Sequence, residues 1–335
     1  MKRYLLLVLT AFLCATCVTW GQNSSVVPPN NDGTLGGVRY LEPGQPAVVI
    51  HPTVEAAKQA RKSSGTSSKN LYYHGGTSDG LEGSIGVETA PKIYLVFWGS
   101  QWNNNDPSGE AAILESFLPG ASGSPWLNTV TQYCQGVASN TYFCSGTYTP
   151  AGNTTGEFIG YWYDNASAAP KHPTQSQLAN EAVNAAAHFG ETSVANNVST
   201  QYVIATATKN SSSGFGTRYC AYHSSTSSSY GDVAYTNLPY ITDAGTSCGA
   251  NFNNLGPDAG ITIVEGHEAA ETVTDQFPSG GWLDSSGYEI GDKCAWITSG
   301  QGATADVTFS TGTYPVQSLW SNAFNSDAGG CVMSY

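Results

Sequence analysis

The chain has 335 residues, only 11% of which are charged, and a formal net charge of −13 at pH 7. With 12 Lys and Arg against 25 Asp and Glu, it offers no basic surface to neutralise phosphates. This balance excludes nucleic acid as a partner and argues against binding to anionic membranes.

The N-terminus has the pattern of an export signal. Lys2 and Arg3 give a positive start, and an apolar run over residues 5–18 is too short to span a bilayer comfortably. We therefore predict a signal peptide over residues 1–21. No second apolar span follows, so we expect a secreted monomer without an integral membrane span, located outside the cell or on its wall.

The rest of the chain divides by composition. Residues 22–70 are rich in turn-forming residues and predict a linker or pro-segment, which leaves a single domain over residues 71–335. Six Cys remain in that domain, and an even number in an exported chain predicts disulfides. The simplest pairing is sequential and joins Cys134 to Cys144, Cys220 to Cys248 and Cys294 to Cys331.

Strands and helices alternate in the first half of the domain. The apolar run KIYLVFW at residues 92–98 predicts a buried strand, and residues 157–163 and 201–207 predict two more. Thr174 and Gln177 have the spacing of a capping box, which predicts a helix start between the last two strands.

The second half adds further strands. Residues 217–223 and 232–236 suggest a strand pair around a Ser-rich loop at 224–229, and residues 305–309 and 314–319 also indicate β-structure. The order predicts a mixed α+β fold, in which helices pack on a twisted mixed sheet.

The densest group of carboxylates lies between residues 261 and 296. The sequence HEAAE at residues 267–271 predicts a helix on which His267 and Glu271 stand one turn apart on one face. This layout is zincin-like: in the zinc-peptidase motif His-Glu-x-x-His, two helix residues hold the metal and the Glu is a base. Here Glu271 replaces the second His, which zinc accepts and which also makes calcium or magnesium plausible.

The expected limits of this helix come from its flanks. Thr262 and Glu265 have capping-box spacing and predict its start, and Pro278 predicts its end. An alternative interpretation is a solvated acidic helix face whose His hydrogen-bonds in a core.

A metal site needs a further ligand from outside the helix pair. Glu289 and Asp292 follow Glu271 by about 20 residues, near the spacing at which thermolysin-like peptidases place their third ligand, a Glu. We therefore predict that His267, Glu271 and Glu289 bind zinc, with calcium as the alternative ion. Asp275 and Asp292 are expected to orient these ligands or to replace one of them.

These residues suggest a secreted metal-dependent hydrolase of peptidase type. Glu268 would act as the general base on the metal-bound water, and His223 would stabilise the oxyanion, with a structural His as its alternative role. The substrate would be a polypeptide. In a rival interpretation the protein is not catalytic: the acids hold calcium or organise a loop, and an aromatic surface binds a cell-wall polymer.

Several segments together resemble a known family. They occur in the same order in the chain, at residues 73–76 (YHGG), 93–99 (IYLVFWG) with Trp102, 220–223 (CAYH), 235–248, 267–271 (HEAAE) and 289–294 (EIGDKC). They resemble the phosphate-induced protein 1 family, also called EXORDIUM-like, and most closely its secreted bacterial members. The segment around Cys248 departs from the Pro- and Trp-rich plant pattern. The resemblance implies an exported extracellular or cell-wall protein and supplies no activity.

Overall fold

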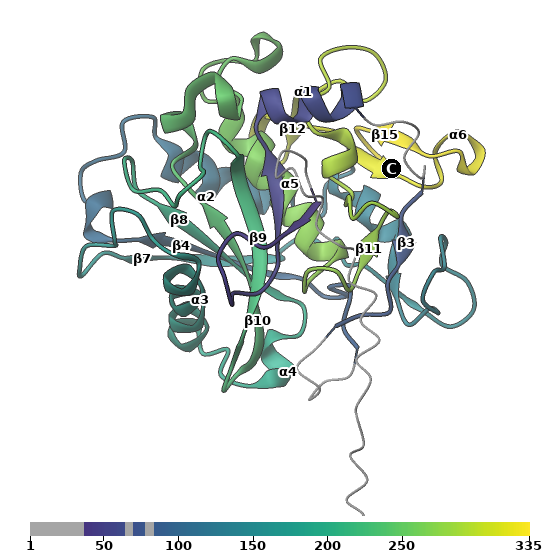
Figure 1. Ribbon diagram of the computed structural model, residues 1–335, viewed down its shortest axis with the longest axis horizontal. Coiled ribbons are helices and arrows are strands. Elements are labelled where there is room, and N and C mark those ends of the chain that lie inside the picture. Colours follow the sequence, from purple (N-terminus) through teal and green to yellow (C-terminus); the bar gives the residue numbers. More distant parts are fainter. Residues whose placement is uncertain (1–36, 64–69, 78–83) are drawn as a thin grey trace, which may run out of the picture.

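The computed structural model describes residues 37–63, 70–77 and 84–335 (Figure 1). The signal peptide predicted at residues 1–21 lies outside these residues. Within the described ranges, no helix combines the length and the apolar character that crossing a bilayer requires.

The described chain folds around a mixed seven-stranded sheet, as the sequence predicts. Its strands lie in the order β1-β2-β9-β10-β8-β4-β7 (Figure 1). Strands β10, β8, β4 and β7 are parallel, and antiparallel pairs add β9, β2 and β1. The bounds are β1 Gly37–Arg39, β2 Val48–Pro52, β4 Lys92–Trp98, β7 Phe158–Asp164, β8 Thr200–Thr206, β9 Tyr219–Ser228 and β10 Gly231–Leu238.

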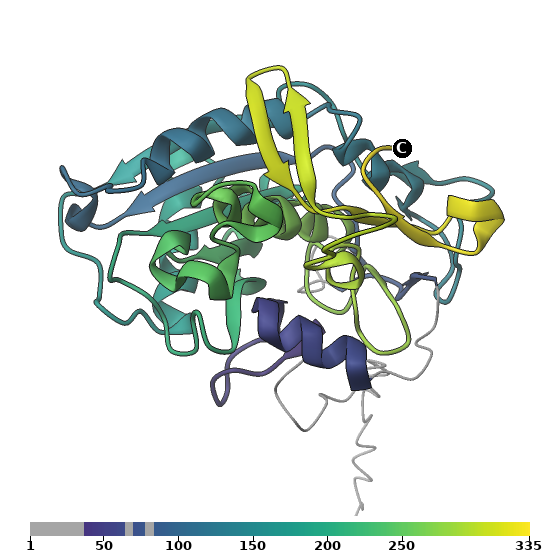
Figure 2. The same ribbon diagram turned by 90° about the horizontal axis from the view of Figure 1, so that it is seen from above.

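Helices cover both faces of this sheet. Helix α3 (Gln175–Phe189) packs on β8 and β10, and α5 (Ala259–Thr274) packs on β9 and β10 from the opposite face, with α2 (Glu110–Ala121) beside it (Figures 1 and 2). The capping box predicted at the start of α3 is present. Strand β4 therefore alternates between two apolar cores, which explains its uninterrupted apolar sequence.

Part of the segment predicted to be a linker or pro-segment belongs to the sheet. Val48, Val49 and Ile50 of β2 are buried, and Val49 lies opposite His223 of β9. The prediction of a linker is therefore wrong over residues 37–63. The short apolar run at residues 48–50 forms a strand because it hydrogen-bonds to the edge of β9. A role as a pro-segment stays a prediction.

The predicted sequential disulfides are present, at Cys134–Cys144, Cys220–Cys248 and Cys294–Cys331. The second ties β9 to the 3-10 helix η3 (Ile241–Cys248), and the third ties η5 (Asp292–Cys294) to β15 (Gly330–Val332). Three disulfides are compatible with an extracellular location.

The Ser-rich stretch predicted as a loop continues β9 to Ser228, because it pairs with β10 along its length.

Smaller elements surround the core. The C-terminal strand predicted at 314–319 is two strands, and the hairpin β12–β13 packs on α5 and α2 (Figure 2). The remaining elements are β3 Tyr72–Tyr73 with β11 Trp282–Leu283, β5 Cys134–Gln135 with β6 Thr149–Pro150, β12 Ala305–Phe309 with β13 Gly312–Val316, β14 Leu319–Ser321 with β15, helices α1 Val54–Ser63, α4 Val194–Asn197 and α6 Phe324–Asp327, and the 3-10 helices η1 Ser100–Trp102, η2 Leu127–Gln132 and η4 Phe252–Asn254.

The burial of β2 can be tested by truncating one of its side chains. Ile50→Ala removes a buried side chain from the α3-side core and should lower the free energy of unfolding by about 2–5 kcal/mol. Lys58→Ala, on an exposed position of α1, should change it by less than about 0.5 kcal/mol. Urea unfolding measures both, and equal small effects would contradict the placement of β2 in the core.

Candidate metal centre

Helix α5, which carries the HEAAE sequence, is enclosed on every side. All 16 of its residues are buried, so the alternative of a solvated acidic face is wrong. The helix begins at Ala259, one turn before the predicted capping box. Thr262 instead donates its hydroxyl to the carbonyl of Pro315 at 2.6 Å, and the Glu265 carboxylate has no hydrogen-bond partner.

Two glycines allow the close packing around this helix. A Cβ atom on Gly266 would lie 3.0 Å from the Trp126 ring and 3.1 Å from the Phe117 ring. A Cβ on Gly291 would lie 2.6 Å from Nδ1 of His267. The loop at Gly291 can therefore pass directly over the His267 ring only because it has no side chain there.

Seven buried ionisable side chains meet at this helix. They come from the middle of β9, from α5 and its C-terminal end, and from the loop that follows β11. We call them the His–carboxylate cluster: His223, His267, Glu268, Glu271, Asp275, Glu289 and Asp292. They are all the site residues that the sequence predicts, and the fold brings every one of them together.

His267 and Glu271 lie on one face of α5, as predicted. His267 Nε2 is 3.0 Å from Glu271 Oε2 and 3.9 Å from Asp292 Oδ1. These three residues form a group whose ligand atoms all lie within 4.8 Å of one another. Asp292, expected only as an alternative ligand, thus occupies the place that the sequence assigns to Glu289.

His223 lies between two sets of carboxylates. Its Nδ1 is 3.3 Å from Glu268 Oε2 and 3.7 Å from Glu271 Oε2, and its Nε2 is 3.6 Å from Glu289 Oε1. Since both ring nitrogens already face acidic oxygens, this position suits a metal ligand or an orienting group better than the donor to an oxyanion that the sequence suggests.

Gln317 orients His267. Its Oε1 lies 3.3 Å from His267 Nδ1, and its Nε2 donates to the carbonyl of Gly291 at 2.8 Å. The amide therefore presents oxygen to the imidazole, which favours a proton on Nδ1. The lone pair of Nε2 then faces Glu271 and Asp292.

His51 on β2 completes the surroundings of His267 and is not recognised by sequence reasoning. Its ring centroid lies 4.1 Å from that of His267, and its Nε2 is 3.3 Å from Oε1 of the same Gln317. The signal that could have identified it is a His directly after the apolar run Val48–Ile50.

Backbone amides hold two of the carboxylates and leave one oxygen of each free. The amide of Asp292 donates to Glu271 Oε1 at 2.8 Å, and the amide of Glu289 donates to Asp292 Oδ2 at 3.3 Å. The second oxygens, Glu271 Oε2 and Asp292 Oδ1, have no hydrogen-bond partner and point at His267. Both groups are thus positioned before any ligand binds.

Several buried polar atoms of the cluster have no hydrogen-bond partner and could therefore ligate a cation. They are His223 Nε2, His267 Nε2, Glu268 Oε1, Glu271 Oε2, both carboxylate oxygens of Glu289, and Asp292 Oδ1. Leaving a buried polar atom unpaired costs about 1–3 kcal/mol, and more for a charged group. A divalent ion would satisfy several of these atoms at once.

A bound cation would change the ionisation of the cluster. Burial raises the pKa of Glu268, Glu271, Glu289 and Asp292 well above the ordinary carboxylate range. Burial lowers the pKa of His223 and of His267 to about 3, so both imidazoles are neutral and keep a lone pair. A bound cation favours the ionised carboxylates, because its charge offsets the cost of their burial.

The donor set indicates the class of metal. Neutral imidazole nitrogen combined with carboxylate oxygen suits zinc and other first-row divalent ions, whereas calcium takes oxygen ligands alone. The imidazole nitrogens are compatible with the predicted zinc, and the identity of the ion stays a prediction.

Comparison with known proteins adds no identity, since no family model, curated protein or solved structure matches the chain. The resemblance to the phosphate-induced protein 1 family stays a prediction. The function therefore has to be inferred from the chemistry of the cluster.

The orienting role of Gln317 gives a test of the centre. Gln317→Met keeps the side-chain size but removes the acceptor for His267 Nδ1–H, and should lower zinc affinity by about 10–100-fold. Competition with a chelating dye measures the affinity. Gln175→Met is the control, because Gln175 is equally buried but lies at the start of α3, on the opposite face of the sheet. Equal affinities for the two variants would contradict the role of Gln317.

Proposed function

We propose that the protein is an exported metal-dependent hydrolase that cleaves peptide bonds with a metal-activated water. One observation carries the proposal. Glu268, a buried carboxylate with one unpartnered oxygen, directly follows His267 on the helix that also supplies Glu271. A base placed beside two helix ligands is the arrangement that hydrolysis by a zinc-bound water needs.

His267 Nε2, Glu271 Oε2 and Asp292 Oδ1 would hold the ion. Three protein ligands leave one position of a tetrahedral zinc ion for water, as in catalytic zinc sites. Gln317 supports this set by fixing the His267 ring, and the backbone amides of the loop at residues 289–292 support the two carboxylates.

The proposed reaction uses Glu268 twice. The metal, when bound, polarises the scissile carbonyl and lowers the pKa of the attacking water. Glu268 accepts a proton from that water as its oxygen bonds to the carbonyl carbon. Glu268 then gives the proton to the amine nitrogen as the C–N bond breaks, so the products are a carboxylic acid and an amine. His223, 3.3 Å from Glu268, orients the base.

Access to the centre requires movement, because every member of the cluster is buried. Three segments contact the His267 ring directly: β2 through His51, the loop at Gly291, and the residues after β13 through Gln317. In this proposal a polypeptide reaches Glu268 after one of them is displaced. The segment that contains β2 is the one that the sequence marks as a pro-segment.

The role of Glu268 separates this proposal from a structural metal site. Glu268→Gln should lower peptide hydrolysis by about 10²–10⁴-fold, because the amide cannot accept the proton, while bound zinc is retained. His267→Ala should lose both zinc and turnover. Peptide cleavage assays and elemental analysis of the purified variants measure these quantities. Undiminished turnover in Glu268→Gln, or a zinc-loaded wild type that cleaves no peptide, would contradict the proposal.

A second candidate function, binding of a cell-wall polysaccharide without catalysis, is favoured by an aromatic pocket. A cavity of about 240 Å³ is lined by residues that include Tyr142, Phe143, Tyr148 and Tyr335. Their exposed fractions lie between 43% and 54%, which is unusually high for large rings. Flat aromatic faces can stack on the C–H faces of sugar rings, and Asn322 and Asp327 beside them are polar. In this candidate function the cluster holds a structural ion.

This second function is tested by removing two of the rings. Tyr142→Ala combined with Tyr148→Ala should weaken binding to insoluble cell-wall polysaccharide roughly tenfold, since each stacked ring contributes about 0.5–1.5 kcal/mol. Co-sedimentation measures the binding. Tyr40→Ala, which removes an equally exposed ring outside the pocket, is the control. Unchanged binding in the double variant would contradict this role of the pocket.

A further inference from the structure

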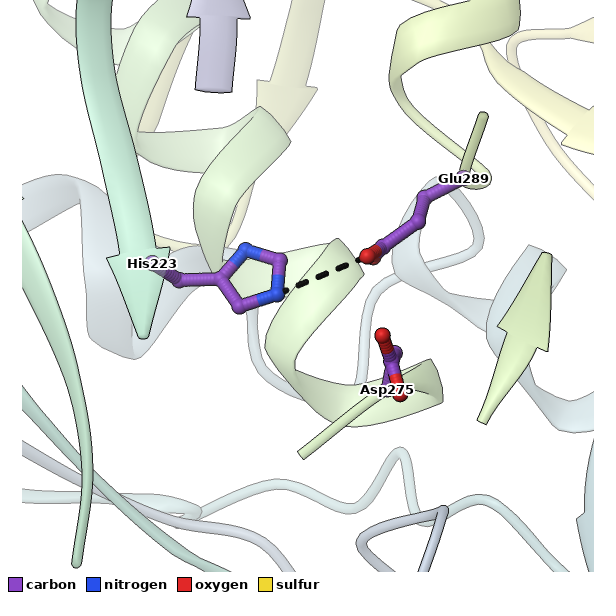
Figure 3. A group of neighbouring side chains, drawn as sticks. All are labelled: His223, Asp275 and Glu289. Carbon is purple, nitrogen blue, oxygen red and sulfur yellow. Dashed lines mark ion pairs between the residues drawn. The ribbon is translucent and has the colours of Figure 1, made fainter. Parts of the chain in front are cut away.

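A second group of ligands lies beside the first in the His–carboxylate cluster. His223, Asp275 and Glu289 place one ligand atom each within 4.8 Å of one another. Figure 3 shows that the three side chains converge from a strand, from the end of a helix and from a loop. None of them belongs to the group formed by His267, Glu271 and Asp292.

The surroundings of His223 determine which nitrogen faces this second group. Nδ1 is 3.3 Å from Glu268 Oε2. An ionised carboxylate can only accept hydrogen bonds, so this contact needs a donor on the imidazole. A proton on Nδ1 satisfies that contact. Nε2 then carries a lone pair, and it faces Glu289 Oε1 at 3.6 Å (Figure 3). Two acceptors thus point at each other, an arrangement that a cation between them would stabilise.

Glu289 gives the independent evidence for a ligand. Its side chain is fully buried, and neither of its oxygens makes a hydrogen bond of standard geometry. A buried carboxylate in this state requires either a proton or a metal ion.

Asp275 is held ready for the same position. Its Oδ2 accepts the amide of Ser279 at 2.8 Å, and its Oδ1 accepts the amides of Gly280 and Gly281. These bonds fix the orientation of the carboxylate. Each carboxylate oxygen has two lone pairs, so Oδ2 keeps one for a further ligand.

We propose that the cluster binds two divalent cations, the second held by His223 Nε2, Glu289 and Asp275. This inference rests on the proposed function, which supplies the first cation at His267, Glu271 and Asp292.

The charge of the carboxylates supports two cations over one. With all five carboxylates of the cluster ionised, one divalent ion would neutralise two of the charges and two ions would neutralise four of them. Unneutralised charges in a buried volume are strongly destabilising.

The position of the two ligand groups gives the second ion a role in the same reaction. Glu268 Oε2 and Glu271 Oε2 both approach Nδ1 of His223, so the base and one ligand of the first group lie beside the residue that ligates the second ion. Paired ions can stabilise the attacking and the leaving atoms of a hydrolysis together. The imidazole and carboxylate donors select a first-row divalent ion such as zinc at this position too.

Metal stoichiometry tests the second site. The full-length mature chain is stripped with a chelator, reloaded with Zn²⁺, desalted and measured by elemental analysis, with circular dichroism to verify folding. Wild type should hold two zinc ions per chain, and Glu289→Gln should hold one. Glu88→Gln should hold two, because Glu88 is an equally buried carboxylate that belongs to none of the metal-binding groups.

The outcomes separate this inference from the proposed function. One zinc ion in wild type that is kept by Glu289→Gln and lost by His267→Ala overturns the second site and leaves the first intact. No zinc in any folded variant overturns both. If Glu289→Gln does not fold, zinc release from wild type to a chelating dye decides: two steps support the second site, and a single step overturns it.

Discussion

Five carboxylates and two imidazoles that share one buried volume impose the main constraint on this fold. Like charges at these distances repel one another strongly, and burial removes the water that would screen them. The surrounding structure stabilises these groups with hydrogen bonds. Backbone amides of the loops at residues 279–281 and 289–292 bind the carboxylates, and Gln317 binds the imidazole of His267. Two disulfides fix the segments next to β9 and to the second loop.

The local part of this arrangement could be predicted from the sequence. His267 and Glu271 share a face because helix geometry alone places residues four apart together, and that requires no knowledge of the rest of the fold. The apolar run of β4 predicts a buried strand, and the sequential disulfides follow from the simplest pairing of the six Cys. The acidic segment around residues 284–292 points to the loop that contributes Glu289 and Asp292 to the cluster.

Features that depend on distant contacts could not be predicted. Asp292 approaches His267 while Glu289 turns to His223, and the path of the loop around Gly291 decides this, not the spacing along the chain. His51 comes from a stretch whose overall composition is that of a linker, since strand formation there depends on the edge that β9 offers. Thr262 has the spacing of a capping box but does not cap the helix. The helix begins one turn earlier, and the Thr262 hydroxyl donates to the carbonyl of Pro315 instead.

The position of β2 in the sheet has a consequence for the rate and order of folding. The strand pairs with β9, more than a hundred residues later in the chain, and the ring of His51 meets Gln317 across a sequence separation of 266 residues. Contacts of such separation close large loops and form slowly. The surroundings of His267 are therefore complete only after residues near both ends of the domain have come together. A cation bound at this centre would slow unfolding, because it would link elements that join late.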